Sequence, residues 1–322
     1  MIARLRRLRT QVLGLNRRNH GYLFRWNPRD RHRLVDDKLA TKAALAAHGV
    51  PAPALYDVCD AQWGVRALGA RLAVRHDFVV KPARGAGGAG IVVVVGRRDE
   101  GFVKASGAVL HRRELEAHAC DVLAGTYSVG GRDDALLVEE RVRADPVLGA
   151  LAYRGVPDVR ILVFRGVPVL AMLRLPTRRS DGRANLHLGG VGVGVDLASG
   201  RTTDAVVGRR LVAAHPDLGR PLRGLLVPEW DEMLALAVRA ADAVGLGFVG
   251  VDVVLDARRG PLVLELNARP GLAIQLANRR GLRPLLDAVG DANVPADPAA
   301  RVALGRALSA PPSPASPPPA GS

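Results

Sequence analysis

The chain has 322 residues, of which 48% are apolar and 24% are charged, so it is long enough for one large domain or two modest ones with a real core. Only 4% of the residues are aromatic, which argues against stacking on nucleic-acid bases as the main activity. No apolar run approaches the roughly 20 residues that span a bilayer, and the basic N-terminus lacks the apolar stretch of a signal peptide.

The formal net charge of +15 is unevenly distributed. Residues 1–33 contain ten arginines and one acid, Asp30, and therefore carry +9, which leaves +6 for the rest of the chain. This predicts a basic N-terminal arm over residues 1–34, which is either a solvated segment or a contact for an anionic partner such as a membrane surface or nucleic acid. The two cysteines, Cys59 and Cys120, form neither a metal motif nor a disulfide framework, which favours the cytoplasm.

Lysine is rare in this chain, which uses arginine for almost every positive charge. The four lysines among the 46 basic residues are Lys38, Lys42, Lys81 and Lys104. A lysine in this background marks a site where a compact point charge is wanted. Lys38 and Lys42 lie one turn apart on a helix that is predicted to begin after Asp36 or Asp37 and to end at Gly49.

A glycine-rich stretch between two apolar runs contains Gly85, Gly87, Gly88 and Gly90. Its spacing fits a dinucleotide-binding fingerprint, but that motif must open a helix, whereas the β-branched run over residues 91–95 predicts a strand. A strand–loop–strand unit is typical of a flexible flap over phosphates, and a glycine-rich hairpin without a ligand is the alternative. Lys81 ends the strand before the flap, where its ammonium group is expected to reach a phosphate.

Two acids end the next predicted strand. Residues 112–123 predict a helix, and residues 135–142 predict an apolar strand that carries Glu139 and Glu140 at its end. Such a strand can line a nucleotide pocket, with backbone groups at the adenine and a carboxylate at the ribose hydroxyls. Solvated acids at a strand end are the alternative.

Two arginines lie inside the apolar strands of a hairpin predicted over residues 158–175. Arg160 and Arg174 are costly in that position unless each meets an anion, and an ion pair between Arg160 and Asp158 is the structural alternative to a bound ligand. Asn185 follows, shortly before a double glycine at residues 189–190 that indicates close approach of backbone to a ligand. Residues 191–207 predict a further small hairpin.

The most informative stretch is a β-hairpin predicted over residues 247–271, after a well-marked helix over residues 228–244. A turn at residues 257–260 places Asp252 opposite Glu265 and on the same face as Asn267. Two carboxylates and an amide suit Mg²⁺, and a polar face that points to solvent is the alternative. Arg269, two residues beyond Asn267, favours a phosphate site. A short helix is predicted near residues 282–289, and residues 309–322, rich in Pro, Ala and Ser, predict a disordered tail.

Taken in order, these segments resemble the ATP-grasp superfamily, and in particular its α-L-glutamate ligase-like branch with the sugar-transfer-associated relatives. The resemblance runs from about residue 16 to about residue 286. It rests on residues 35–42 and 48–53, the glycine loop with its lysine at 80–90, residues 158–160, residues 171–174 leading to 185–190, and Asp252 with residues 265–271.

The resemblance implies an α+β ATP-grasp fold, in which two α+β subdomains grip ATP between antiparallel sheets. The ATP-grasp domain would occupy residues 35–308, with the subdomain split near residues 130–140. The implied ATP-binding residues are Lys38, Lys81, Gly85, Gly87, Gly88, Gly90, Glu139, Glu140 and Asn185. Asp252, Glu265 and Asn267 would hold two Mg²⁺ ions, with Mn²⁺ as an alternative. Arg160, Arg174 and Arg269 would neutralise the transferring phosphate or the substrate carboxylate.

The implied activity is that of an ATP-dependent carbon–nitrogen ligase. ATP would phosphorylate the carboxylate of a small molecule or peptide, and an amine would attack the acyl phosphate to form an amide-type bond. Many ligases of this superfamily carry a full α/β domain ahead of the helix with the Asp-Asp-Lys motif. Here a partner protein or the basic arm is expected to complete the amine-acceptor site. The alternatives are a basic anion-binding protein that docks nucleic acid or membrane, and an ATP-binding module without ligase activity.

Overall fold

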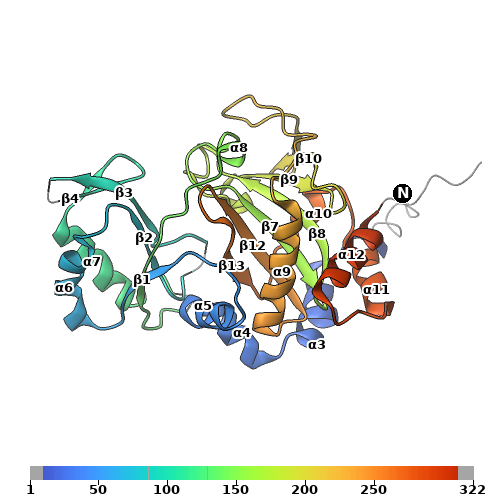
Figure 1. Cartoon of the computed structure of the whole chain (residues 1–322), viewed down its shortest axis with the longest axis horizontal. Coiled ribbons are helices and arrows are strands. Elements are labelled where there is room, and N and C mark those ends of the chain that lie inside the picture. Colours follow the sequence, from blue (N-terminus) through green and yellow to red (C-terminus); the bar gives the residue numbers. More distant parts are fainter. Residues whose placement is uncertain (1–9, 86, 100, 129, 311–322) are drawn as a thin grey trace, which may run out of the picture.

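The computed structural model describes residues 10–85, 87–99, 101–128 and 130–310, and these form two antiparallel sheets with helices around them (Figure 1). The first sheet has the order β1-β6-β2-β3-β4-β5, and the second has the order β11-β10-β9-β8-β7-β12-β13. All strand pairs within the two sheets are antiparallel. The predicted α+β class with two antiparallel sheets is therefore confirmed.

The first sheet contains β1 (Leu55–Cys59), β2 (Phe78–Pro82), β3 (Val92–Arg98), β4 (Gly101–Lys104), β5 (Val109–Leu110) and β6 (Leu136–Glu139). Helices α6 (Gln62–Leu72) and α7 (Arg112–Leu123) cover one of its faces. Leu68 of α6 and Leu115 of α7 pack with Phe78, Val80 and Val94 of the sheet in one buried cluster. The last strand of this sheet in chain order, β6, ends at Glu139, so the chain leaves the first sheet there. The sequence predicted the boundary between the subdomains near residues 130–140.

The second sheet contains β7 (Asp158–Phe164), β8 (Val167–Leu175), β9 (Val191–Val195), β10 (Thr202–Val207), β11 (Arg210–Val212), β12 (Phe248–Asp256) and β13 (Gly260–Asn267). Side chains alternate between the two faces of this sheet, and Val251 and Val253 lie in one buried cluster with residues of helix α9 (Trp230–Val244). Figure 1 shows α9 lying across one face of the sheet. Two short elements, α8 (Pro146–Gly149) and η2 (Leu186–Leu188), lie in its loops. The predicted hairpins over residues 158–175, 191–207 and 247–271 are all present.

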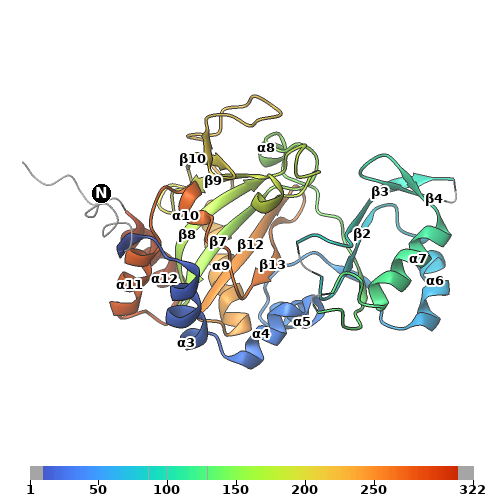
Figure 2. The ribbon, with the colours of Figure 1, turned by 180° about the vertical axis from the view of Figure 1, so that it is seen from behind.

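The opposite face of the second sheet is covered by α10 (Ile274–Ala277), α11 (Arg283–Asp291) and the N-terminal segment (Figure 2). A final helix, α12 (Pro298–Ser309), packs against β8 and α9. Ser309 is buried at the end of α12, so the predicted tail begins inside a helix, and its residues 311–322 lie outside the described residues. None of the described helices combines the length and apolarity needed to cross a bilayer.

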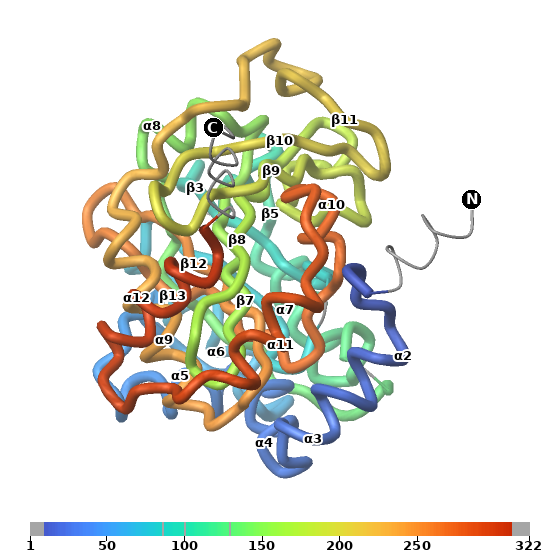
Figure 3. The backbone as a smooth tube through the Cα atoms, turned by 90° about the vertical axis from the view of Figure 1, so that its right-hand side faces the viewer, coloured from blue at the N-terminus to red at the C-terminus, as the bar shows by residue number. Residues whose placement is uncertain are grey.

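The described part of the basic N-terminal segment is packed against the second sheet and is not the separate arm that the charge distribution predicted. It folds into α2 (Leu15–Arg17), the π-helix η1 (Arg18–Leu23), α3 (Phe24–Trp26) and α4 (Arg29–Asp36), and Figure 3 shows these blue helices running past the red α10 and α11. Leu13, Tyr22 and Leu23 are buried in the same cluster as Phe164 and Phe248. The apolar residues between the arginines thus anchor residues 10–36 to the second sheet, whereas residues 1–9 lie outside the described residues.

Helix α5 (Lys38–Ala47) lies where the two halves of the molecule meet (Figure 1). Asp37 caps it, because its side chain accepts from the backbone N–H groups of Leu39 and Ala40. On one side α5 packs against α9 of the second half, and on the other Lys38 donates to the backbone of Gly85 in the first half. The predicted helix with its Asp cap therefore connects both sheets.

Candidate functional site

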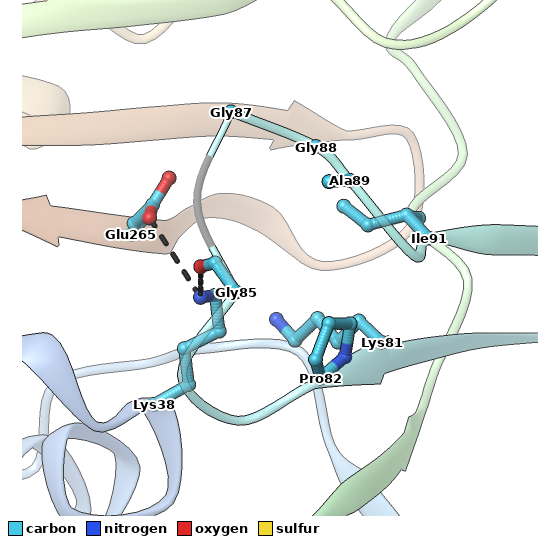
Figure 4. Close-up of a pocket in the computed structure, with 9 residues that line it drawn as sticks. All are labelled: Lys38, Lys81, Pro82, Gly85, Gly87, Gly88, Ala89, Ile91 and Glu265. Carbon is cyan, nitrogen blue, oxygen red and sulfur yellow. Dashed lines mark hydrogen bonds and ion pairs between the residues drawn. The ribbon is translucent and has the colours of Figure 1, made fainter. Parts of the chain in front are cut away.

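A small cleft opens between the two sheets, where side chains from α5, β2, the glycine loop and β13 converge (Figure 4). Its cavity has a volume of about 30 Å³. The lining residues are Lys38, Lys81, Pro82, Gly85, Gly87, Gly88, Ala89, Ile91 and Glu265. The structure thus brings together the two lysines, the glycine loop and one of the two carboxylates that the sequence singled out.

Lys38 reaches into this cleft from the first turn of α5. Its Nζ donates to the carbonyl of Gly85 at 2.5 Å and lies 4.0 Å from Oε1 of Glu265, as Figure 4 shows. Burial lowers the pKa of Lys38, and the Glu265 carboxylate opposes that shift. Lys38 therefore links the glycine loop of the first half to the terminal hairpin of the second.

Lys81 and Lys42 share one buried carboxylate. Nζ of Lys81 lies 2.7 Å from Oε2 of Glu139, and Nζ of Lys42 lies 3.2 Å from Oε1 of the same side chain. Glu139 is only 2% exposed, so two ammonium groups compensate its charge inside the protein. Its carboxylate is occupied in this arrangement, and its role at the adenine or ribose stays a prediction.

Glu140 turns away from this cluster. Its carboxylate pairs with Arg259 in the turn of the terminal hairpin at 2.5 Å and accepts from the backbone N–H of Ala54. Its backbone N–H donates to the carbonyl of Ala54. Glu140 therefore ties the end of the first sheet to the second half, and its predicted contact with the nucleotide remains untested.

The glycine loop joins two antiparallel strands, β2 and β3, as the flap interpretation predicted. The dinucleotide fingerprint does not apply, because a strand and not a helix follows the glycines. Gly90 has a φ of +71°, and a Cβ at this position would lie 2.7 Å from the Tyr127 ring, so a side chain is excluded there. Near the tip, Cδ of Arg183 lies 3.5 Å from a Cβ built on Gly88, so a loop of the second half contacts the flap.

The terminal hairpin places Asp252 opposite Glu265 and Gly250 opposite Asn267, and Nδ2 of Asn267 donates to Oδ2 of Asp252 at 3.1 Å. The predicted pairing of these two carboxylates is confirmed, although the residues nearer the turn pair differently. Strand β13 begins at Gly260, which pairs with Asp256, and one extra residue, Leu264, shifts the register between Val253 and Asp252. This bulge returns Glu265 to the face of Asp252.

Asp252 lies at the centre of a buried ion-pair network. Arg160 donates from Nε to Oδ1 at 2.6 Å and from Nη2 to Oδ2 at 2.5 Å, and Nη2 of Arg174 lies 2.7 Å from Oδ2. Arg174 also donates to Asp158 at 2.5 Å. The predicted alternative pair between Arg160 and Asp158 is thus corrected: Arg160 pairs with Asp252, which faces it across β7 and β12, and Asp158 pairs with Arg174, which faces it across β7 and β8.

The pKa values in this network follow from burial and from the guanidinium groups. Burial opposes the charge on Asp252, but Arg160 and Arg174 outweigh burial and hold its pKa below the usual range. For Asp158 burial prevails over Arg174 and raises the pKa to about 6. The two guanidinium groups therefore favour the ionised form of Asp252, which is the form that a metal ligand requires.

The donor set of Asp252, Glu265 and Asn267 has the hard oxygen chemistry that suits Mg²⁺. Asp252 is 1% exposed and ionised, and the Glu265 side chain is 42% exposed towards the cleft with Lys38 4.0 Å away. Among the described residues, no group of three or more His, Cys, Asp or Glu side chains lies close enough to hold a metal without other donors. The residues fit a Mg²⁺ ion that takes its remaining ligands from phosphate and water.

The remaining predicted site residues, Arg269 and Asn185, make contacts with other parts of the protein. The Arg269 guanidinium is half-exposed and contacts Asp36 at 3.3 Å. Asn185 accepts from the backbone N–H of His187 and so caps η2, which leaves its predicted ligand contact untested. Sequence reasoning gave no site role to Lys42 or Arg183, although the rarity of lysine had already marked Lys42.

Comparisons with known proteins agree with this geometry. A family model described as sugar-transfer associated ATP-grasp matches residues 17–291. A probable alpha-L-glutamate ligase of Xanthomonas oryzae pv. oryzae (strain MAFF 311018) is 31% identical over 249 residues, which cover 76% of this chain and 61% of that protein. A probable alpha-L-glutamate ligase of Sodalis glossinidius (strain morsitans) is 31% identical over 164 residues, which cover 47% of this chain and 43% of that protein. The matches thus span between about two fifths and three fifths of these relatives.

Solved structures with similar folds include ATP-grasp ligases. The D-cycloserine synthetase DcsG has a TM-score of 0.43 and 20% identity, and the match covers 86% of this chain and 71% of that chain. The ATP-grasp ligase PsnB, complexed with a phosphomimetic variant of its minimal precursor, Mg and ADP, has a TM-score of 0.45 and 18% identity, with 82% of this chain and 60% of that chain covered. At these scores the likenesses support no statement about the site.

Proposed function

This chain belongs to the sugar-transfer-associated ATP-grasp family, and from that premise we propose that it is an ATP- and Mg²⁺-dependent ligase that joins a carboxylate to an amine. The observation that carries the proposal is the convergence of Lys38, Lys81, the glycine loop and Glu265 in one cleft between the two sheets. Phosphoryl transfer depends mainly on positioning and charge neutralisation, and this cleft supplies both.

The lysines supply the charge for the phosphates. Glu139 compensates one of the two ammonium groups that surround it, so the pair of Lys42 and Lys81 keeps one positive charge for an anionic ligand. Lys38 adds a second ammonium group at the base of the flap. A triphosphate between Lys38 and Lys81 would therefore meet two compact cations in a site shielded from bulk water.

The glycine loop would act as the lid. A cavity of about 30 Å³ is close to the space of one water molecule, so the flap must move outward to admit a nucleotide. Its glycines adopt positive φ values at Gly87, Gly88 and Gly90 and leave the backbone N–H groups free of steric cover. Arg183, which lies near Gly88 of the flap, would add a positive charge close to the bound phosphates.

The hairpin residues would act on the reacting groups. Mg²⁺, when bound by Asp252, Glu265 and Asn267, supplies positive charge to the phosphate oxygens, and the family resemblance implies two such ions. Oδ2 of Asp252 accepts from Arg160 and Asn267 and contacts Arg174. Among the described residues, Oδ1 accepts from Arg160 alone, so Arg160 must release Oδ1 before Asp252 can serve as a ligand. The released guanidinium is then available to neutralise the transferring phosphate or the substrate carboxylate.

The reaction follows from this arrangement. An oxygen of the substrate carboxylate attacks the terminal phosphorus of ATP and ADP leaves, which gives an acyl phosphate. The amine then attacks the acyl carbon, loses a proton, and expels inorganic phosphate as the amide-type bond forms. The relatives named as glutamate ligases make glutamate, or a peptide that carries it, the first substrate to test, and the use of ATP fits a cytoplasmic enzyme.

A product screen tests the proposal directly. The full chain is incubated with ATP and Mg²⁺ over a panel of carboxylates and amines, ADP is measured, and products are identified by mass spectrometry. We expect ADP formation that requires both the carboxylate and the metal, together with a product heavier by the amine minus water. ADP without a ligated product would favour an ATP-binding module of another kind, and no nucleotide binding at all would contradict the proposal.

A further inference from the structure

One half-buried arginine of the N-terminal segment pairs with no carboxylate in the described part of the chain. Arg18 opens the π-helix η1, which packs on the second sheet. Its Nη1 donates to the carbonyl of Pro270 at 3.0 Å, and its Nε and Nη2 donate to Oδ1 of Asn19 at 3.0 and 2.8 Å. All these acceptors are uncharged. Since a guanidinium carries five N–H groups, two remain without a partner among the described residues.

A second arginine lies beside it. Burial lowers the pKa of Arg18, and the positive charge of Arg269 lowers it further. The only carboxylate that pairs with Arg269 among the described residues is Asp36, at 3.3 Å and half-exposed. Burial and the charge of Arg269 lower the pKa of the nearby His32 ring, and the Asp36 carboxylate opposes that shift. The two guanidinium groups and the one carboxylate thus leave a net positive charge here, which an anion would neutralise.

This place adjoins the proposed catalytic residues. Pro270, which accepts from Arg18, has its Cβ 2.9 Å from a Cβ built on Gly250, and Nε of Arg160 lies 3.7 Å from the same point. Arg160 in turn holds Asp252. Arg18 is therefore linked to the buried network through Pro270 and Gly250, just beyond the end of β13.

We propose that Arg18 and Arg269 form a subsite for a carboxylate that does not react, so that the substrate class is a dicarboxylate or a peptide with a second carboxylate. The inference rests on the proposed ligase function and specifies its substrate. The two N–H groups of Arg18 that lack partners donate to the carboxylate oxygens, and Arg269 supplies a second charge. The packed N-terminal segment is then a wall of the substrate site.

Calorimetry with glutarate and with its monoamide tests the subsite on the full chain in the presence of ADP and Mg²⁺. The two probes share the same carbon chain and differ by one carboxylate. We expect wild type to prefer glutarate and Arg18→Gln to lose about tenfold in glutarate affinity with little change for the monoamide. Arg17→Gln is the matched control, because Arg17 is exposed on the same segment. Arg18→Lys keeps the charge and should recover part of the preference.

Several results would overturn the subsite. Equal affinity of wild type for glutarate and its monoamide would do so, as would unchanged glutarate binding in Arg18→Gln. Inorganic phosphate that competes with glutarate and binds equally well would assign the place to phosphate. If circular dichroism shows that Arg18→Gln is unfolded, Arg269→Gln is measured with the same probes and the same expected loss. ADP binding is measured separately. If ADP does not bind but glutarate does, the ligase function is contradicted. If ADP binds but glutarate does not, only the subsite is contradicted.

Discussion

Each half of the molecule buries a cluster of charges, and the two clusters are built differently. In the first half, Glu139 lies between the ammonium groups of Lys42 and Lys81, which leaves one positive charge in excess. In the second half, Asp158 and Asp252 are matched by Arg160 and Arg174, and the charges balance. Lysine provides a compact charge that can turn to a ligand, whereas the planar guanidinium fixes a carboxylate through paired hydrogen bonds. The first cluster is therefore suited to hold phosphate, and the second is suited to position Asp252.

The largest expected effect is on the free energy of unfolding when the second cluster loses its centre. Asp252→Asn leaves Arg160 and Arg174 with a neutral partner in a buried place, and breaking such a network costs about 3–5 kcal/mol. The matched change in the first cluster, Glu139→Gln, should cost less, about 2 kcal/mol, because Lys42 and Lys81 make fewer and longer contacts and have flexible stems.

Urea denaturation of both variants measures this difference. Asp252→Asn should also abolish metal-dependent ADP formation. A larger loss of stability in Glu139→Gln than in Asp252→Asn would show that the arginine network is not the more rigid of the two clusters.

A smaller effect on stability, with a larger effect on binding, is expected for Lys81→Met. The change removes the short contact to Glu139 but leaves Lys42 as its partner, so the cost in unfolding free energy is about 1–2 kcal/mol. Loss of one ammonium group at the phosphates should weaken ATP binding about tenfold or more. Calorimetry with ATP measures the binding, and Lys104→Met on β4 is the control. Unchanged ATP affinity in Lys81→Met would mean that the first cluster is purely structural.

The smallest effect on stability is expected for Glu265→Gln. Its side chain is 42% exposed and its nearest cation, Lys38, is 4.0 Å away, so the free energy of unfolding should change by less than about 0.5 kcal/mol. Metal-dependent ADP formation should nevertheless fall to background, because the change removes one of the two carboxylate ligands. A metal titration of ADP formation checks this, and wild-type turnover would contradict the assignment of the hairpin as the metal site.

Part of this arrangement could be predicted from residue types alone. Two of the four lysines, Lys38 and Lys81, line the cleft, and a third, Lys42, shares a carboxylate with Lys81, as expected for a chain that otherwise uses arginine. The opposition of Asp252 and Glu265 was predicted from a turn placed one residue differently, and Leu264 restores the register through a bulge. Hydrophobic alternation predicts strands well, but a bulge is set by how the two strands twist against each other.

The partners of the buried charges were harder to predict, because they depend on which strands are neighbours. Arg160 could have paired along its own strand with Asp158, but the sheet order brings β12 alongside β7, and Asp252 then lies directly opposite. The N-terminal segment was read from its charge as an arm. Its scattered apolar residues Leu13, Tyr22 and Leu23 come together in one buried cluster only when the segment packs on the second sheet. Charge composition does not show such a pattern.

The contacts of the N-terminal segment also determine the order in which the chain can fold. Asn27 bonds to the backbone of Phe248, 221 residues later, and the Leu13 N–H donates to Gln275, 262 residues later. The first sheet lies wholly within residues 55–139 and can assemble as soon as it leaves the ribosome. Leu13 and Asn27 must instead wait for residues more than 200 positions later, which makes the second half the slow, non-local step of folding.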